Sequence, residues 1–412
     1  MAGFRRGDAA FVVGAVSVAH FLSHVFLLAY PPLFPLLASD FGVSTTQLGL
    51  LVTAIYVPQL LLQVPLGGVV DRAGGKRVLV AGLLVTSVAI GASGLATAYW
   101  QLLAFALLSG IGQSVFHPAD YALLETVTTP DNEGLGFSVH TFGGYAGFAA
   151  APLTIGAVAL TIGWQPALLA AGVVGVVVAL AIAATTEPVH AERIIKGDEM
   201  DAEPDDADRT AERDEEEGGV VREFTAYLTR PTLLLVFVFY LFSMMALVGL
   251  QSFTTVYAVD AYGLTESTAN TLLSVHLTAT AVGVLLGGPL ADRVPYRPVV
   301  VGSILLGALG VVAIVAAPGA GLAVAFSLFT LVGLLFGLAL PSRDKFANAA
   351  ADPEAVGKSF GFFFTGLSLG AVVSPTLIGA VIDGVSAPAG FLTVAGFLVV
   401  AAGIVVVAAR RQ

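Results

Sequence analysis

The sequence predicts an all-α integral membrane protein with twelve transmembrane helices, arranged as two related six-helix bundles with both termini in the cytoplasm. Three observations lead to this fold class. The 412 residues are 57% hydrophobic and only 11% charged, whereas soluble domains carry about 25% charged residues. Apolar runs long enough to cross the roughly 30 Å hydrocarbon core recur from end to end. Several sequence features also occur twice, about half a chain apart.

Each apolar run is expected to form one helix, because lipid cannot satisfy exposed backbone hydrogen-bonding groups. The alternating ten-residue segments that are typical of a membrane β-barrel are absent from the sequence. Short turns separate the runs. The expected helices lie near residues 9–37, 45–70, 77–97, 100–127, 134–160, 164–186, 231–259, 266–291, 297–317, 321–350, 355–382 and 387–409.

One long polar stretch divides these helices into two groups of six. We expect an N-terminal bundle at 1–187, an acidic cytoplasmic linker at 188–230 and a C-terminal bundle at 231–412. The linker is rich in Asp and Glu and poor in apolar residues, which predicts that it is largely disordered. Its composition favours a solvated linker over a partner-binding tail.

The basic residues set the orientation of the chain. All 18 Lys and Arg residues fall on one side of the expected helices or inside the tenth helix toward that side. The loops on the opposite side contain none. Because basic loops stay in the cytoplasm, both termini and the long linker are predicted to be cytoplasmic.

A charged, glycine-rich turn occurs in both halves. GGVVDRAGGKRVL spans Gly67–Leu79, and a shortened copy, GGPLADRVPYRPV, spans Gly287–Val299. Further along, glycines and prolines recur at one common offset. Such a parallel duplication is used by secondary transporters that bind substrate between their halves. The recurring residues include Pro118, Gly134, Gly147 and Pro152 in the first half and Pro341, Gly357, Gly370 and Pro375 in the second.

The chain resembles the major facilitator superfamily over essentially its full length. The turn at 67–79 is similar to the superfamily's signature between helices two and three, and the second turn is similar to its weaker copy between helices eight and nine. Within the superfamily, the chain resembles the fosmidomycin resistance protein type of exporter. This second resemblance rests on His20-Phe-Leu-Ser-His24 before Tyr30-Pro-Pro, and on GIGQSVFHP at 110–118.

The resemblance implies that the first turn acts as a cytoplasmic latch that holds one access state. Asp71 lies near the C-terminal end of helix two, where the helix dipole disfavours an anion, so it needs compensation from basic neighbours. A turn that only sets topology would explain the basic residues but not Asp71 with its glycines. The second copy lacks the later glycines, so we expect it to hold less strongly. The candidate latch residues are Gly67, Asp71, Arg72, Gly74, Lys76, Arg77, Asp292 and Arg293.

Histidines within the apolar segments are candidates for function, because ionisable groups are costly there. His20 and His24 share one helix face, and His117 lies at a similar depth in helix four. The resemblance places helices one, four, seven and ten around a central cavity. We therefore expect these three residues to handle protons or substrate. Histidines that only bridge helices are an alternative, and a metal site is less favoured because no carboxylate or thiolate stands beside the pair. His140 and His276 are expected to be packing residues.

Asp120 and Arg343 occupy equivalent positions in helices four and ten. A charge at such depth needs a partner, so we expect the two residues to bridge the halves when the cytoplasmic side closes. Local pairing of Arg343 with Asp344 is the alternative. The remaining polar candidates for substrate contact are Gln113, Tyr30 and Gln251. The pathway is otherwise apolar, which suits a small amphiphilic solute.

Helices five and eleven share a pattern of small residues and an interior proline. Small residues allow close helix packing, and proline favours a kink. The resemblance connects the pattern in helix five with a glycine-proline motif of proton-coupled antiporters, although Ala151 replaces the glycine before the proline. The residues concerned are Gly147, Pro152, Gly370 and Pro375.

The function that we expect is proton-coupled efflux of small organic, drug-like compounds by alternating access. An uptake symporter for a small organic anion, coupled to protons or sodium and anchored on Arg343, is the first alternative. A membrane sensor that does not transport is the second. No nucleotide motif, nucleophile triad or metal signature occurs in the sequence. We therefore expect no enzyme activity, no cofactor, no metal and no nucleic-acid partner, and a monomer in the plasma membrane.

Overall fold

The computed structural model of the chain describes residues 6–129, 132–185 and 225–410, and it shows no strand within them. Twelve helical segments in this part of the chain are long and apolar enough to cross a membrane. The predicted all-α membrane fold is therefore confirmed. Most of the predicted linker at 188–230 lies outside the described residues, and the orientation of the termini stays a prediction.

The N-terminal half contains six spans, of which three are interrupted. The first span is formed by three pieces, the fourth by two and the fifth by three, whereas each of the others is one helix. The elements are α1 (Arg6–Leu27), η1 (Pro31–Leu33), α2 (Phe34–Phe41), α3 (Thr45–Ala73), α4 (Gly75–Ser93), α5 (Tyr99–Gln113), α6 (Phe116–Val127), α7 (Glu133–Ala151), η2 (Pro152–Gly156), α8 (Ala157–Ile162) and α9 (Trp164–Ala184).

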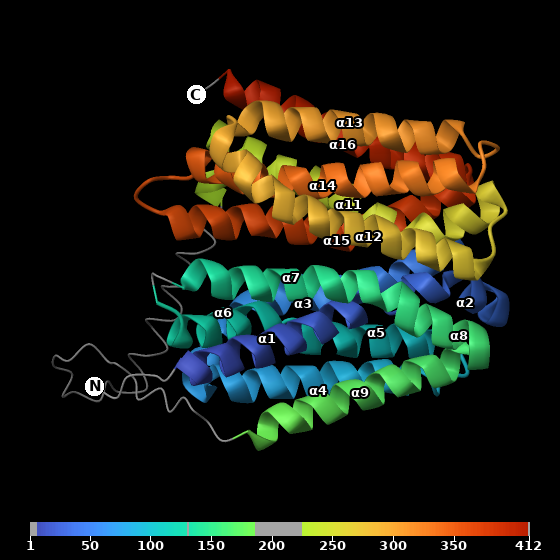
Figure 1. Cartoon of the computed structure of the whole chain (residues 1–412), viewed down its shortest axis with the longest axis horizontal. Coiled ribbons are helices and arrows are strands. Elements are labelled where there is room, and N and C mark those ends of the chain that lie inside the picture. The colour runs from blue at the N-terminus through green and yellow to red at the C-terminus, as the bar shows by residue number, and fades with distance from the viewer. Residues whose placement is uncertain (1–5, 130–131, 186–224, 411–412) are drawn as a thin grey trace.

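Each span of the C-terminal half is a single helix. The six helices are α11 (Pro231–Tyr262), α12 (Glu266–Arg293), α13 (Tyr296–Ala316), α14 (Leu322–Ala350), α15 (Val356–Gly384) and α16 (Ala387–Ala409). The two halves form two layers, with α1–α9 below and α11–α16 above in Figure 1. We call the end where α1 begins and α16 ends the terminal side, at the left of Figure 1, and the opposite end the far side.

Prolines stand at or near the interruptions of the N-terminal half. The helix is interrupted between α5 and α6 at Ser114 and Val115, and Pro118 has no N–H to donate to the carbonyl of Ser114. A five-residue π-helix, η2, begins at Pro152. The equivalent Pro341 lies inside an unbroken α14. The two halves therefore share an architecture, but the N-terminal half has helix breaks in the region where it positions polar side chains.

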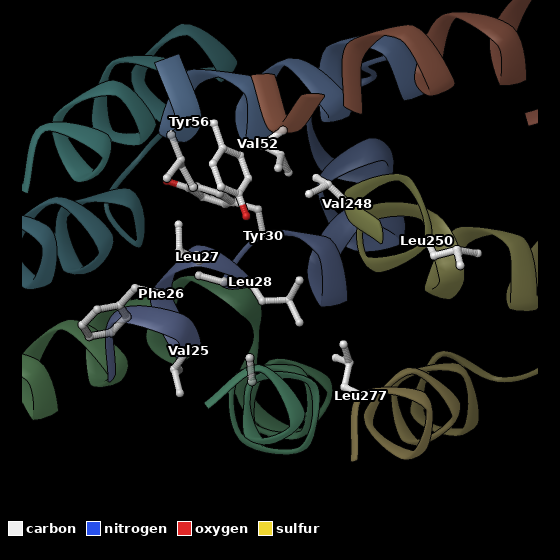
Figure 2. Close-up of a cluster of buried hydrophobic side chains, with 14 of the residues drawn as sticks. Val25, Phe26, Leu27, Leu28, Tyr30, Val52, Tyr56, Val248, Leu250 and Leu277 are labelled. Carbon is white, nitrogen blue, oxygen red and sulfur yellow. The ribbon is translucent and has the colours of Figure 1, made fainter. Parts of the chain in front are cut away.

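The halves pack against each other mainly through two helix pairs, α3 with α15 and α7 with α12. The contacts between α3 and α15 lie toward the far side, where Thr53 Oγ1 donates to the Val372 carbonyl at 2.7 Å. In the other pair, Ser274 Oγ of α12 donates to the Ala149 carbonyl of α7. Between these pairs, buried hydrophobic side chains of α1, α3, α11 and α12 join the halves (Figure 2).

A carboxylate from the C-terminal half caps a helix of the N-terminal half on the far side. Asp383, at the end of α15, accepts from the backbone N–H groups of Thr45 and Thr46 at 2.9 and 2.7 Å. It also accepts from Thr46 Oγ1 at 2.6 Å. The first N–H groups of a helix lack partners within the helix, and the positive end of the helix dipole attracts an anion. The far side of the molecule is therefore closed by a specific contact between its halves.

Candidate functional site

A cavity of about 400 Å³ lies between the halves on the terminal side. It lies between α7 and the last half of α12, and Pro341 of α14 also lines it. Five polar or aromatic side chains of α7 face apolar residues of α12 across it. Its other lining residues are Phe137, Ser138, Thr141, Phe142, Tyr145, Ala281, Val284, Leu285, Gly288 and Pro289. The molecule is therefore hollow on the terminal side and closed on the far side.

A buried cluster of histidines around one aspartate lies in the N-terminal half. His20 Nδ1 of α1 is 2.9 Å from Asp120 Oδ2 of α6. His140 Nε2 of α7 is 3.7 Å from the same oxygen. The ring centroid of His20 lies 4.4 Å from that of His24, 5.6 Å from that of His117 and 3.9 Å from that of His140. We refer to these five residues as the His–Asp cluster.

The His–Asp cluster is largely buried, with His24 and His117 partly exposed, and it is incompletely hydrogen-bonded. Asp120 has no exposed surface, and His20 and His140 are 4% and 2% exposed. Four of its polar atoms have no hydrogen-bond partner among the described residues: Asp120 Oδ1 and the Nδ1 atoms of His24, His117 and His140. A buried polar atom without a partner is costly, so such a group is retained where it has a task. Here the unpartnered atoms are sites that can accept or donate a proton.

The local structure of three helices brings the cluster together. The break before α6 places His117 and Asp120 in its first turns, where the two residues are three apart and share a face. On α7, Gly144 faces the rings, because a Cβ there would lie 2.7 Å from His24 Cε1 and 2.8 Å from His20 Cδ2. Only a glycine leaves room for both rings at this position.

The composition of the cluster also allows a metal ion to be considered. The ligand atoms of His20, Asp120 and His140 all lie within 4.8 Å of one another. A metal was disfavoured from the sequence because no carboxylate stood beside the histidine pair, but the fold brings in Asp120. The 2.9 Å between His20 and Asp120 is nevertheless a direct hydrogen bond. Two ligands of a tetrahedral zinc ion at about 2.0–2.2 Å would lie about 3.3–3.6 Å apart, which is longer than this contact. The geometry favours a shared proton.

The other expected contact residues lie away from the cavity. Tyr30 is fully buried, and its hydroxyl is 2.7 Å from Ser93 Oγ. Gln113 donates from Nε2 to the Ser23 carbonyl at 2.8 Å, which ties α5 to α1 one residue before the break. Gln251 is a buried residue of α11. A substrate contact for these three residues stays a prediction.

The latch residues lie on the terminal side at the ends of α3 and α12. Asp71 is exposed and makes no ion pair within the described ranges. Gly74 adopts φ +87° in the tight turn between α3 and α4, a conformation that favours glycine. In the second copy, Asp292 pairs at 2.6 Å with Lys345 of α14, in the same half. Lys76 donates from Nζ to the Thr185 carbonyl at 2.5 Å. Thus no latch contact joins the halves among the described residues of this state.

Asp120 and Arg343 do not contact each other in this structure. Asp120 is paired with histidines of its own half, whereas Arg343 Nη2 lies 2.9 Å from Asp344 Oδ1. The local pairing considered from the sequence is therefore present. A bridge between Asp120 and Arg343 stays a prediction for a state in which the terminal side is closed.

Close helix contacts occur at the expected glycines of helices five and eleven. A Cβ on Gly147 would lie 3.0 Å from His24 Cβ of α1, and one on Gly370 would lie 3.1 Å from Met244 Cβ of α11. Pro152 begins the π-helical turn, while Pro375 lies inside the continuous α15. The kink that was expected twice is therefore marked by a change of helix type only in the N-terminal half.

The sequence of the whole chain decides its family. The family model described as Major Facilitator Superfamily matches residues 16–269 and 253–412. The chain belongs to this superfamily. Members are transporters, and the twelve spans place this one in the membrane as a multi-pass protein. The family resemblance seen in the sequence is confirmed.

Two relatives and one solved structure show how this superfamily member compares with known proteins. It is 25% identical to the uncharacterized MFS-type transporter YfnC of Bacillus subtilis (strain 168), over 92% of this chain and 87% of that protein. It is also 25% identical to the fosmidomycin resistance protein of Escherichia coli (strain K12), over 71% of this chain and 68% of that protein. Its fold is similar to a bacterial homolog of the human lysosomal transporter Spinster in an inward-facing and occupied conformation. That comparison has a TM-score of 0.78 and 16% identity, and it covers 99% and 98% of the two chains.

Two members of the cluster do not follow from the sequence expectations. Asp120 is expected to pair with Arg343, although it stands three residues after His117, a spacing that indicates one helix face. His140 is expected to be a packing residue, and its contact with Asp120 depends on how α7 packs against α1. That packing in this superfamily member cannot be deduced from the histidine alone.

Proposed function

We propose that this protein is a proton-coupled exporter of small organic compounds, and that the His–Asp cluster is its coupling centre. The observation that carries the proposal is the buried hydrogen bond between His20 and Asp120, surrounded by three further histidines. Histidine exchanges protons near neutral pH, and a proton shared with a buried carboxylate neutralises a charge that lipid and protein would otherwise have to stabilise.

Export is supported by two further observations. A relative of comparable length is the fosmidomycin resistance protein, which the chain matches over most of its length. The cavity lies toward the side of the molecule that the basic residues predict to be cytoplasmic. Its largely apolar lining suits an amphiphilic solute, since each hydroxyl of a sugar would need a partner. Substrate would enter this cavity and leave on the far side after the halves rock.

The test is flux in proteoliposomes under an imposed pH gradient, with fosmidomycin as the first probe. We expect the wild-type protein to drive the probe against its gradient and to stop when a protonophore is added. His20→Gln and His117→Gln should retain downhill exchange but lose the response to the pH gradient. Insensitivity of the wild type to a metal chelator is expected as well.

A matched control is available in the C-terminal half. His276 is equally buried but lies outside the cluster, where its Nδ1 is 2.9 Å from the Phe329 carbonyl. His276→Gln should leave coupling intact. Wild-type coupling in both cluster variants would eliminate the histidines as the coupling centre. Accumulation in the direction of proton entry would instead favour the uptake symporter.

A further inference from the structure

Three hydrogen-bond donors converge on one carboxylate oxygen in the C-terminal half. Asp344 Oδ1 accepts from Arg343 Nε at 2.9 Å and from Tyr240 Oη at 3.0 Å. Arg343 Nη2 lies 2.9 Å from the same oxygen. Consecutive residues of a helix do not face each other, so Arg343 must fold back to reach its neighbour. The contact between Tyr240 of α11 and Arg343 of α14 therefore determines how the donors reach Asp344.

The helix face that carries Asp344 borders the cavity on the terminal side. Pro341, three residues before Asp344 and therefore on the same face of α14, lines that cavity, as does Tyr145 of α7. The guanidinium of Arg343 is also stacked over the ring of Tyr240 at 4.9 Å. The Arg343 side chain is 19% exposed, but that of Asp344 is 52% exposed. The cation is held in place, whereas its anionic partner can turn toward water.

We propose that Asp344 Oδ1 occupies the place of an anionic oxygen of the transported compound. A small organic anion, such as a carboxylate or a phosphonate, would displace Asp344 and take over the donors of Arg343 and Tyr240. Arginine suits this task because it stays charged and its planar fork matches two anionic oxygens. The apolar side chains of α12 across the cavity would contact the body of the compound. This inference rests on the proposed function and names the substrate class of the same cavity.

The exchange keeps the number of charges in the cavity constant. One anion arrives and one carboxylate leaves the guanidinium, so no unpaired charge is buried at any stage. A neutral compound cannot make this exchange, because it would leave Asp344 on Arg343 and gain only weaker contacts. A cation would be repelled by Arg343. The site therefore distinguishes compounds of the same shape by their charge.

The experiment measures binding of three probes that share one ring, benzoate, benzamide and benzylamine, to the purified full-length protein at pH 7.5. In the wild type we expect benzoate to bind about tenfold more tightly than benzamide, the effect of one charge-assisted hydrogen bond. Asp344→Asn should tighten benzoate binding by about the same factor, since the competing anion is gone. Arg343→Gln should abolish the preference for benzoate.

Asp352 provides a matched control, because its carboxylate is also paired with an arginine, Arg230, at 2.5 Å but outside the spans. Asp352→Asn should not change binding of any probe. If Asp344→Asn binds benzoate no better than the wild type, the inference is overturned. Because this variant keeps Arg343, its result can be interpreted without a second variant. Equal binding of benzoate and benzamide by the wild type also overturns it.

The outcome is separable from that of the proposed function. Proton-driven flux without any preference for anions would contradict the anion site and leave the exporter proposal intact. Selective benzoate binding without a response to a pH gradient would support the anion site and contradict proton-coupled export. The double variant R343Q/D344N removes both charges together, so its stability shows whether a loss in Arg343→Gln reflects an unpaired Asp344 or the loss of the anion site.

Discussion

Asp120 is the residue that holds the His–Asp cluster together, because it is the only acidic member and contacts two of the four rings directly. Its environment has no other cation among the described residues within salt-bridge distance. The charge of the cluster is therefore adjusted by protons on its own histidines. A change that moves these rings without touching a titratable group should show how far coupling depends on their geometry.

Gly144→Ala is such a change. The added Cβ would lie within 2.7 to 2.8 Å of the His20 and His24 rings, so the rings or α7 must shift, at a cost of about 1–3 kcal/mol for overpacking. We expect a lower thermal stability and a weaker response of transport to the pH gradient. Gly134→Ala is the control in the same helix, because nothing lies within 4 Å of its added Cβ. If both variants transport alike, ring geometry is not critical.

Part of this site could be predicted from single residues. The spacing of His20 and His24 and the depth of His117 placed three rings in one region, where the structure also has them. The partners of Asp120 could not be predicted, because a buried carboxylate is satisfied equally by a distant cation or by nearby histidines. Which of these occurs depends on helix packing and on the access state, and neither is encoded in a local pattern.

At the scale of the elements, the contact of Asp383 with the start of α3 is the clearest connection between the halves. The Asp383 carboxylate makes three hydrogen bonds to Thr45 and Thr46. Capping interactions of this kind contribute about 1–2 kcal/mol. Because the two partners belong to different halves, the contact stabilises only the state in which the far side is closed.

Asp383→Asn should therefore shift the protein toward opening on the far side. Spin labels at Leu95→Cys and Val385→Cys, both on exposed far-side loops, would report a longer and broader distance. The chain has no native cysteine, so only these sites are labelled. Asp40→Asn is the control, since Asp40 accepts at 2.5 Å from Trp164 Nε1 within one half. An unchanged distance in Asp383→Asn would remove the contact as a gate.

Asp71→Asn should act in the opposite direction. Asp71 makes no ion pair within the described residues of this state, so a latch formed only in the other state would lose about 1 kcal/mol while this state is unaffected. We expect the short far-side distance to become more populated. Asp292→Asn is the comparison, because Asp292 is already paired within its half and should shift the equilibrium less. A longer distance in Asp71→Asn would contradict the latch.

The helices themselves were largely predictable, but their interruptions were not. Continuous hydrophobic length determines where a span begins and ends, and the expected segment at 45–70 corresponds to Thr45–Ala73. Hydrophobic length does not reveal the break between α5 and α6, because this break lies inside an apolar run. Pro118 and Pro341 are equivalent in sequence, yet only the first stands next to a break. Neighbouring helices decide whether a proline interrupts a helix.

At the scale of the whole molecule, the halves are closed on the far side and separated by a cavity on the terminal side. From the positions of the basic residues, we expect the cavity to face the cytoplasm.

Labelling of single cysteines tests this orientation. Thr141→Cys, in the cavity lining, should react with a membrane-impermeant maleimide in inside-out vesicles and not in intact cells. Leu95→Cys, 69% exposed on the far side, should show the reverse pattern. Reaction of Thr141→Cys from outside the cell would mean that the termini face outward or that the resting state is different.

The His–Asp cluster lies within one half, whereas the Asp383 contact joins the two halves, and this difference has a kinetic consequence. The hydrogen bond between His20 and Asp120 lies within one half, so rocking of the halves does not by itself break it, whereas the bonds of Asp383 cross between the halves and must break and re-form each time. Proton loading and rocking are then separate steps with separate barriers. A stronger far-side contact would slow the cycle at saturating substrate without altering how many protons accompany each molecule.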